Sequence, residues 1–387
     1  MSLLRPVLGH RTLNLRVRQL RGLSTATKPA AGQTNKHATS NRVRLVEVGP
    51  RDGLQNEKKT IPLTTKIELI SRLAKTGLTD IEAGSFVALK WVPQAHWQMA
   101  DSNEIMEYIL KYPPTSLNPI AYSFLAPNAK GLQNALSILK THPSAYSTLS
   151  EQATPPYESS SLPNESAADP TTKRPLIELS VFAAATESFT QKNLNCSIAE
   201  SLSKFQEVIE GAKEQDLRVR AYISVVLGCP FEGYDVDPHR VAEIACDLMQ
   251  MGADEISLGD TTGMGTAPRT KELLKAMRSA GIRSEDIAMH FHDTYGQALV
   301  NTAVSLESGI TTFDSSVGGL GGCPYSPGAT GNVSTEDMIY FVESLGMTTG
   351  VDLDAVTDIG AWIANEIGKE NSSSVGKVIL GKRLAQQ

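Results

Sequence analysis

The sequence predicts an α/β protein built as a (β/α)8, or TIM, barrel with extra C-terminal helices and one disordered insertion. Short apolar runs alternate eight times with segments of helical spacing. Continuous alternation of this kind gives a parallel sheet, and eight units close a barrel. The alternative is an open doubly wound sheet. No Gly-x-Gly-x-x-Gly follows the first strand, which argues against it.

The first unit illustrates how each element is predicted. Residues 43–48 alternate apolar and polar side chains and end at Gly49-Pro50, as a strand does. Residues 64–76 carry apolar side chains at helical spacing, and Gly77 ends the helix. The other expected strands are 79–82, 119–125, 176–184, 218–226, 254–258, 286–290 and 310–314. The other expected helices are 101–111, 128–140, 198–213, 239–251, 270–279, 297–308 and 335–346.

The alternation is interrupted once. Residues 141–174 are rich in Ser, Thr, Pro, Ala and Glu and show no apolar period, so we expect a disordered, low-complexity insertion. We divide the chain into a leader and linker over 1–42, a barrel over 43–350 and a C-terminal helical extension over 351–387.

Charge is distributed unevenly along the chain. Residues 1–44 contain nine Lys or Arg and no Asp or Glu, although the whole chain has a formal net charge of -6. Removing those nine leaves 27 basic against 42 acidic residues, or -15. An Arg-rich, acid-free leader is typical of a mitochondrial transit peptide and predicts the mitochondrial matrix; the alternative is a basic disordered tail.

Composition excludes several classes of protein. The acidic body argues against nonspecific nucleic-acid binding. No stretch approaches the roughly 18–20 apolar residues of a membrane span, so we expect no membrane partner. The four cysteines are widely spaced without a Cys-x-x-Cys pair, which suits a reducing compartment.

His290 and His292 are the first candidate site residues. They end the strand predicted at 286–290 and, two residues apart, should point to the same side. Two imidazoles on one face can bind a metal, although a His-x-His pair can also be two unrelated polar residues at a strand end.

Polar residues recur at the ends of other predicted strands. Barrel enzymes carry their chemistry at the carboxyl ends of the strands, so a shared placement predicts a common site. The residues at these ends are Arg51, Asp52, Glu82, Tyr222, Ser257, Asp260, Cys323 and Asn332.

Several motifs resemble the 3-hydroxy-3-methylglutaryl-CoA lyase family, within the barrel metallolyase superfamily. The resemblance covers most of residues 43–375 apart from the insertion. The motifs are Gly49-Pro50-Arg51-Asp52-Gly53-Leu54-Gln55-Asn56-Glu57, Ser85-Phe86-Val87, Lys90-Trp91-Val92-Pro93-Gln94, His290-Phe291-His292-Asp293-Thr294-Tyr295-Gly296-Gln297-Ala298 and Gly318-Gly319-Leu320-Gly321-Gly322-Cys323-Pro324-Tyr325.

The resemblance implies an activity and a metal site. The family cleaves 3-hydroxy-3-methylglutaryl-CoA by a retro-Claisen reaction to acetyl-CoA and acetoacetate, in leucine degradation and ketone-body formation. It also implies a homodimer, an acyl-CoA substrate and Mg2+ or Mn2+ as cofactor. The implied metal ligands are Asp52, His290, His292 and Asn332, and the mixed nitrogen and oxygen donors suit Mn2+.

Further roles follow from the chemistry of that reaction. Arg51 can stabilise the enolate oxygen and contact substrate, unless it forms only a structural salt bridge. Glu82 and Asp260 are candidates to orient ligands or assist proton loss. Cys323, on a Gly-rich loop, can protonate the carbanion. Tyr222 and Ser257 are candidate substrate contacts, and Asp293, turned to the other face, is predicted to be structural.

Some residues depart from the family pattern or bear on alternatives. Gly84 and Ala88-Leu89 differ near a site loop, which leaves open a lyase for a related 3-hydroxyacyl-CoA. A Claisen-type synthase of the isopropylmalate or homocitrate type usually has Glu where this chain has Leu54. A non-catalytic barrel used as a scaffold would be expected to lack a ligand, yet all four positions are filled.

Overall fold

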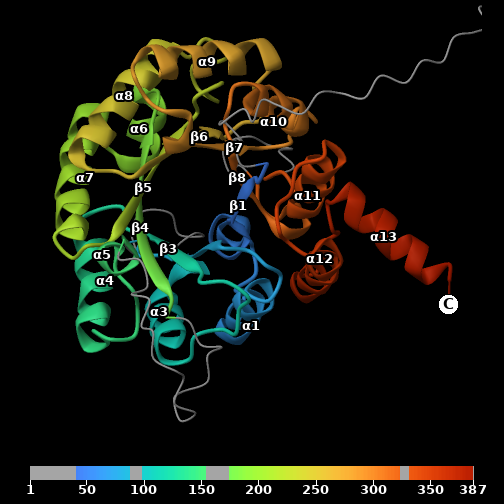
Figure 1. The fold of residues 1–387 in the computed structure, drawn as a ribbon. Helices are drawn as coiled ribbons and strands as arrows, with labels where there is room; N and C mark the ends of the chain where they lie inside the picture. The colour runs from blue at the N-terminus through green and yellow to red at the C-terminus, as the bar shows by residue number, and fades with distance from the viewer. Residues whose placement is uncertain (1–40, 88–97, 154–173, 323–330, 387) are drawn as a thin grey trace, which may run out of the picture. The chain divides into compact units, whose positions relative to one another are not determined.

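The computed structural model describes residues 41–87, 98–153, 174–322 and 331–386. Within those ranges, eight parallel strands follow one another in chain order around a closed barrel, and β1 pairs with both β2 and β8 (Figure 1). The predicted (β/α)8 fold is therefore confirmed. The strands are β1 (Arg44–Glu47), β2 (Asp80–Ser85), β3 (Ala121–Leu125), β4 (Leu176–Ala184), β5 (Arg218–Ser224), β6 (Glu255–Asp260), β7 (Ile287–Phe291) and β8 (Thr312–Ser315).

Helices surround this barrel, and two more follow it at the C-terminal end, as predicted (Figure 1). The sequence did not predict α5, α6 or the short turns η1, η2 and η3. The helices are α1 (Leu63–Leu73), α3 (Ser102–Lys111), α4 (Ala129–Thr141), α5 (Leu149–Ala153), α6 (Glu187–Leu194), α7 (Ile198–Lys213), α8 (Pro238–Met251), α9 (Ala267–Ser279), α10 (Ala298–Glu307), α11 (Thr335–Ser344), α12 (Leu353–Ile367) and α13 (Ser374–Leu384). The short turns are η1 (Gly49–Gly53), η2 (Ser284–Asp286) and η3 (Val317–Gly319).

Local sequence sets the ends of these helices. At α7, Ser197 and Glu200 form a capping box, in which each side chain accepts the backbone N–H of the other residue. At α8, Asp237 accepts the N–H of His239 and Pro238 occupies the first turn. Gly252 then ends α8 with a left-handed backbone, which glycine adopts without a Cβ clash.

The strands separate an apolar layer from a polar interior. Side chains such as Leu45, Ile81 and Phe313 alternate outward and belong to the buried core that includes the surrounding helices. The residues of opposite parity face the barrel axis, and many are charged, among them Arg220 and Glu255, each 1% exposed. Charged groups are rarely fully buried without partners, so the interior must supply counter-charges.

The predicted insertion has ordered structure at its start. Ser147 pairs with Leu176 at the beginning of β4, and α5 is held by the Leu149 N–H, which donates to the carbonyl of Asp216 at 3.1 Å. These contacts lie at the amino-terminal ends of the strands. The rest of the insertion, 154–173, and the leader over 1–40 lie outside the described residues.

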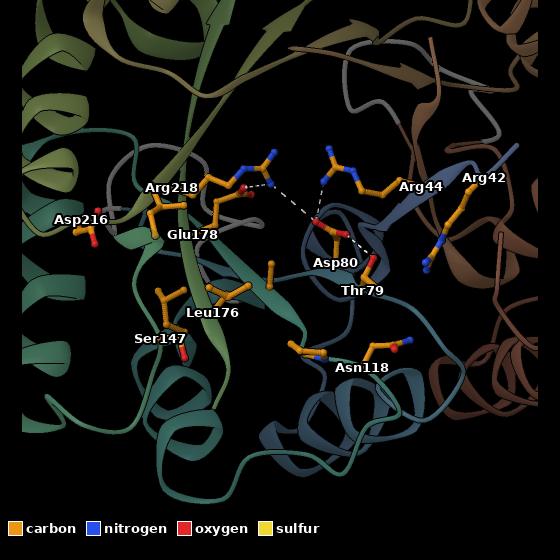
Figure 2. A pocket seen from close by; sticks show the side chains of 14 residues that line it. Arg42, Arg44, Thr79, Asp80, Asn118, Ser147, Leu176, Glu178, Asp216 and Arg218 are labelled. Atoms are coloured by element: carbon orange, nitrogen blue, oxygen red, sulfur yellow. Dashed lines mark hydrogen bonds and ion pairs between the residues drawn. The ribbon is translucent and has the colours of Figure 1, made fainter. Parts of the chain in front are cut away.

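A pocket of about 540 Å³ opens at that amino-terminal end of the barrel (Figure 2). Its charged lining is internally paired: Arg44 contacts Asp80 at 2.8 Å, and Arg218 contacts Glu178 at 2.8 Å. Elsewhere in the described chain, no helix has the length and apolar character needed to span a membrane.

Two buried carboxyl groups hold the segment after β8, one from β1 and one from α11. Glu47 accepts the N–H groups of Gly49 at 2.8 Å and Val317 at 2.9 Å, while Glu336 on α11 accepts the N–H of Gly318 at 2.9 Å. Burial raises the pKa of Glu47 to about 7 and that of Glu336 to about 8, although these hydrogen bonds act in the opposite direction. Both groups therefore resist ionisation inside the fold.

This arrangement predicts a pH-dependent stability. The folded pKa of Glu336 lies above the ordinary glutamate value of 4.5, so the folded state binds more protons between about pH 4.5 and 8. Its stabilising contribution is full below that window and is lost as pH rises through it, on the order of 1 kcal/mol per pH unit. We expect Glu336→Gln to flatten the pH dependence of the unfolding free energy, measured by urea titration from pH 5 to 8.5.

Glu343 provides a matched control, because it lies on the same helix and is exposed. Glu343→Gln should leave the slope of the wild type unchanged. If Glu336→Gln and wild type have equal slopes, the buried carboxyl does not carry this dependence.

Candidate metal centre

His290 and His292 lie at the carboxyl end of β7 and are both buried. Their rings are 5.3 Å apart between centroids, on the side of the strand that faces the barrel axis. The Nδ1 of His290 lies 3.1 Å from Oδ2 of Asp314, whereas Nδ1 of His292 has no hydrogen-bond partner among the described residues. The alternation predicted from the sequence therefore does bring the two imidazoles together.

Asn332 is brought to the same point by backbone pairing. The Asp293 N–H donates to the Gly331 carbonyl at 2.9 Å, and the Val333 N–H donates to the Phe291 carbonyl at 3.1 Å. This short antiparallel bridge places Asn332 directly opposite His292, although the two residues are 40 positions apart in the chain.

Asp52 enters from η1, a tight π-helical turn that directly follows β1. Its Oδ2 accepts from Nδ2 of Asn332 at 2.9 Å and lies 3.9 Å from Nε2 of His290. Burial alone would raise the pKa of Asp52, but the charge of Arg51 and the nearby His290 and His292 outweigh it and lower that pKa. The carboxylate is thus held ionised and ready to bind a cation.

These side chains fit a divalent metal. One donor atom from each of Asp52, His290 and His292 lies within 4.8 Å of the others. Nδ1 of His292 and Oδ1 of Asn332 are buried without a hydrogen-bond partner in the described part of the chain. Buried polar atoms normally have partners, so two unpaired atoms beside a carboxylate are what a candidate cation site would show.

Protonation at His292 is also disfavoured. Burial, and next the charge of His290, lowers the pKa of His292 to about 4. A neutral imidazole is the form that binds metals.

Arg51 connects this cluster to the opposite wall of the barrel. Its guanidinium contacts Oδ1 of Asp52 at 2.9 Å and Oε2 of Glu82 at 2.6 Å, and it lies 5.4 Å from the ring centre of Tyr222. Glu82 is fully buried, and burial raises its pKa despite the Arg51 charge. The guanidinium is therefore oriented by three groups and sits beside the candidate ligands.

Comparison with known proteins shows relatives along most of the chain. Residues 160–363 match the family model described as HMGL-like. The chain is 48% identical over 88% of its length to a 3-hydroxy-3-isohexenylglutaryl-CoA/hydroxy-methylglutaryl-CoA lyase of Pseudomonas aeruginosa, of which it covers 98%. It is 44% identical over 88% of its length to a mitochondrial hydroxymethylglutaryl-CoA lyase of Gallus gallus, again covering 98%.

A solved structure of a Pseudomonas aeruginosa hydroxymethylglutaryl-CoA lyase has a TM-score of 0.73 at 46% identity, over 89% of this chain and 99% of that one. The chain belongs to the 3-hydroxy-3-methylglutaryl-CoA lyase family. This membership confirms the resemblance in the sequence motifs and makes the protein a carbon–carbon lyase.

Within this lyase fold, the remaining predicted site residues lie at different depths. Ser257 is fully buried below the metal-binding cluster, and its hydroxyl donates to Asp314 at 2.9 Å. Asp260 alternates to the other side of β6, where it accepts the Gly265 N–H at 2.9 Å. Burial raises the pKa of Asp260 to about 7.

Of two further candidate site residues, Tyr222 is described by the structure and Cys323 is not. The Tyr222 hydroxyl accepts from Arg220 at 2.9 Å, and its ring meets His290 edge-on at 6.2 Å. Cys323 lies outside the described residues. Asp293 caps α10 by accepting the Ala298 N–H at 3.0 Å, as its predicted structural role requires.

Sequence reasoning missed Asp314 and Arg220, which lie directly beneath His290. A signal was present, because Asp314 follows Phe313 within one predicted strand and Arg220 stands between Val219 and Ala221 in another. Charged residues in the middle of predicted barrel strands should have been treated as inward-facing and paired.

The approach of two loop ends near Asn332 generates a prediction. Gly331 has φ of +100°, and a Cβ there would lie 2.7 Å from the carbonyl carbon of Gly321. We expect Gly331→Ala to destabilise the fold by about 1–3 kcal/mol and to displace Asn332. Thermal unfolding and metal titration would measure the two effects.

Gly322→Ala is the matched control, since a Cβ at Gly322 meets no atom within 4 Å in the described structure. It should unfold like the wild type. Equal stability of the two variants would contradict the steric argument.

Proposed function

We propose that this lyase cleaves 3-hydroxy-3-methylglutaryl-CoA to acetyl-CoA and acetoacetate. The observation that carries the proposal is the convergence of Asp52, His290, His292 and Asn332, with two buried acceptor atoms left unpaired. Family membership supports the same reaction. The four residues would hold Mg2+ or Mn2+, and the mixed imidazole and oxygen donors suit Mn2+.

The bound cation would supply Lewis acidity toward the substrate's tertiary alcohol and carboxylate. The protein's own residues prepare the site for that task. Asp52 is kept ionised beside Arg51, and His292 is kept neutral by burial. Both states are the ones that bind metal rather than protons.

Arg51 is placed to act on the thioester. In the reaction the alcohol loses its proton, the bond between C2 and C3 breaks, and the electron pair moves onto the thioester as an enolate. A guanidinium held by Glu82 and the ring of Tyr222 can accept that developing oxygen charge without reorganising. Tyr222 and Ser257 lie on the neighbouring strands β5 and β6. The Ser257 hydroxyl already donates its hydrogen bond to Asp314.

Proton transfer completes the reaction. Glu82 contacts Arg51 and has a carboxyl pKa raised by burial, so it remains our candidate to take up the substrate proton. Asp260 has a carboxyl pKa raised by burial to about 7, but its side chain lies on the outer side of β6, so any role of Asp260 would be indirect. The enolate must finally be protonated at carbon to give acetyl-CoA. Cys323 remains our candidate acid for that step, since Asn56 donates to the Gly322 carbonyl at 2.7 Å and so fixes the residue preceding it near η1.

A basic pocket near the site suits the coenzyme A portion. Its volume is about 680 Å³, and its lining includes Asn56, three lysines (Lys58, Lys59 and Lys369) and two glutamates (Glu57 and Glu366), of which Glu57 is paired with Lys369. Lysine ammonium groups bind phosphates as point charges. Because Asn56 also contacts the loop before Cys323, a nucleotide in this pocket would direct its thioester toward the metal centre.

The Pseudomonas aeruginosa relative named for two acyl-CoA substrates supports a second candidate function, cleavage of a related 3-hydroxyacyl-CoA. Residues Ala88 and Leu89, which depart from the family pattern, lie outside the described residues. We further propose a mitochondrial location and a homodimer. Their support is the Arg-rich leader, the mitochondrial relatives and the family.

An assay tests the reaction directly. Purified protein is incubated with 3-hydroxy-3-methylglutaryl-CoA, with and without Mg2+ or Mn2+, and acetoacetate is measured. Metal-dependent release of acetoacetate is expected. Condensation of acetyl-CoA with a 2-oxo acid, without cleavage, would instead assign a Claisen-type synthase.

Removing single ligands should weaken metal binding. We expect Asp52→Asn and His292→Ala to lower the affinity for Mn2+ by roughly tenfold or more, because each removes one donor of the cluster. Electron paramagnetic resonance of free Mn2+ measures the affinity.

Asp293→Asn serves as the control, since Asp293 neighbours His292 in sequence but caps α10. It should bind Mn2+ like the wild type. Full affinity in both ligand variants would rule out this metal centre.

The role of Cys323 is tested by Cys323→Ser. We expect the variant to fold and bind Mn2+ normally but to lose at least about tenfold in kcat, with a smaller change in KM, because a hydroxyl is a much weaker acid than a thiol. Steady-state kinetics equal to those of the wild type would make Cys323 a structural residue.

A further inference from the structure

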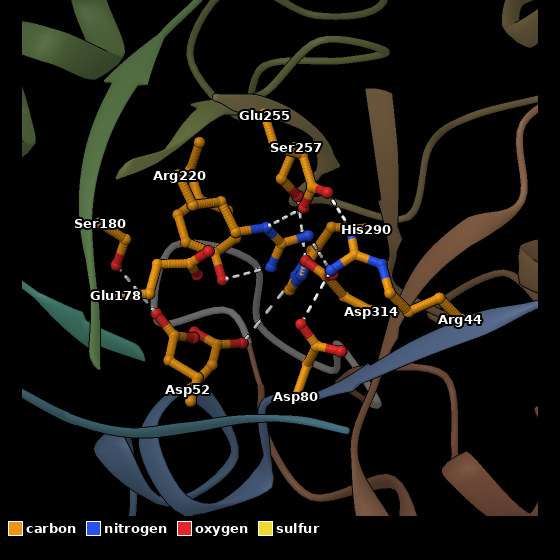
Figure 3. Close-up of polar contacts among 12 residues, drawn as sticks. Arg44, Asp52, Asp80, Glu178, Ser180, Arg220, Glu255, Ser257, His290 and Asp314 are labelled. Atoms are coloured by element: carbon orange, nitrogen blue, oxygen red, sulfur yellow. Dashed lines mark hydrogen bonds and ion pairs between the residues drawn. The ribbon is translucent and has the colours of Figure 1, made fainter. Parts of the chain in front are cut away.

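The barrel interior contains a run of charges that leads to His290. Arg220, on β5, is 1% exposed and lies between two carboxylates. Its Nη2 contacts Oδ1 of Asp314 at 2.6 Å, and its Nε contacts Oε1 of Glu255 at 2.8 Å. Figure 3 shows Arg220, Glu255 and Asp314 close together with His290 inside the barrel.

Asp314 uses its second oxygen for the site. Oδ2 receives the Ser257 hydroxyl at 2.9 Å and faces Nδ1 of His290 at 3.1 Å. Charged Asp314 can only accept hydrogen bonds, so the proton of a neutral His290 must be on Nδ1. The lone pair is then on Nε2, the atom that points toward Asp52.

We propose that Asp314, fixed by Arg220, is a positioning residue that sets the tautomer and orientation of His290 for metal binding. The inference rests on the proposed metal centre. Partners of this kind commonly orient metal-bound imidazoles, and their loss typically costs about 10–100-fold in metal affinity.

The placement of Arg220 explains why a carboxylate is needed. Guanidinium groups only donate hydrogen bonds, so whatever replaces Asp314 must turn an acceptor toward Arg220. An asparagine would point its carbonyl oxygen at Arg220 and its NH2 group at Nδ1 of His290. That donor would force the proton of His290 onto Nε2, where the metal should bind.

The rest of the network keeps Arg220 in place. Glu255 also contacts Arg44 and, at 3.0 Å, Arg218, both near the amino-terminal mouth of the barrel. The contacts of the buried Arg220 guanidinium thus come from β5, β6 and β8, and Arg44 on β1 contacts one of these partners, Glu255. Removing charged groups from water costs free energy, so a buried ion pair is weak evidence that it stabilises the fold. A role in orienting His290 explains the buried charges better than a role in stability.

The test begins with the metal-free protein. Selective 15N-histidine labelling and long-range 1H–15N correlation spectra at pH 8 report which nitrogen of His290 carries hydrogen, with assignment by His290→Gln. We expect the Nδ1–H form in wild type and the Nε2–H form in Asp314→Asn. An Nε2–H imidazole in wild type would overturn the proposal.

Metal affinity provides the second measurement. Asp314→Asn should weaken Mn2+ binding by roughly 10–100-fold. Glu178→Gln is the matched control, because it neutralises another buried carboxylate of the interior, paired with Arg218 and not with Asp314 or His290. It should change the affinity by less than about threefold. An equal loss in both variants would show a general charge effect and overturn the positioning role.

Should Asp314→Asn fail to fold, Asp314→Leu/Arg220→Met removes the pair together, leaves no uncompensated cation from that pair and offers no acceptor at position 314 to Nδ1 of His290. The same loss of Mn2+ affinity is expected, and wild-type affinity would overturn the proposal. The proposed metal-dependent lyase function and the positioning role of Asp314 can be disproved independently. A wild type that binds no metal contradicts the proposed function, whereas the tautomer of His290 in metal-free protein still decides the role of Asp314.

Discussion

The buried guanidinium of Arg220 is the constraint around which the barrel interior is arranged. A cation with 1% exposure is tolerated only if anions replace its water, and Glu255 and Asp314 do so from two other strands. The apolar core accordingly lies outside the strands, between them and the helices. The alternation of side chains along each strand thus directs apolar residues outward to the helices, where they pack, and the charged network around Arg220 inward to the barrel axis.

The sequence allowed the fold to be predicted because its signals are local. Apolar runs, helical spacing and Gly or Pro stops recur eight times, and the order of strands in a parallel barrel follows the chain. The predicted strand at 176–184 matches β4 in both ends. Turns such as η1 were missed because Gly49-Pro50 is typical of a strand end and carries no helical spacing, although the hydrogen bonds that shape the turn are local and run from the N–H groups of Arg51 and Gly53 to the Val48 carbonyl.

The site was predicted only in part, because some of its residues are brought together by contacts between distant parts of the chain. His290 and His292 could be paired from their spacing, and Asn332 was assigned through the family resemblance. The bridge that brings Asn332 to His292 joins residues that no local pattern connects. The direction of Asp260 and the burial of Ser257 beneath His290 likewise depend on strand register, which a single sequence does not specify.

The position of the candidate ligands along the chain has a consequence for how the barrel opens. Asp52 follows the first strand, whereas Asn332 follows the last, 280 residues later, and their side chains meet. A cation bound by both side chains would link the segments that follow β1 and β8, the two strands whose pairing closes the barrel. A ligand that binds only the folded state stabilises it by mass action, so the concentration of free metal would set the free energy needed to separate β1 from β8. Depletion of the ion would loosen the first strand before the middle of the barrel.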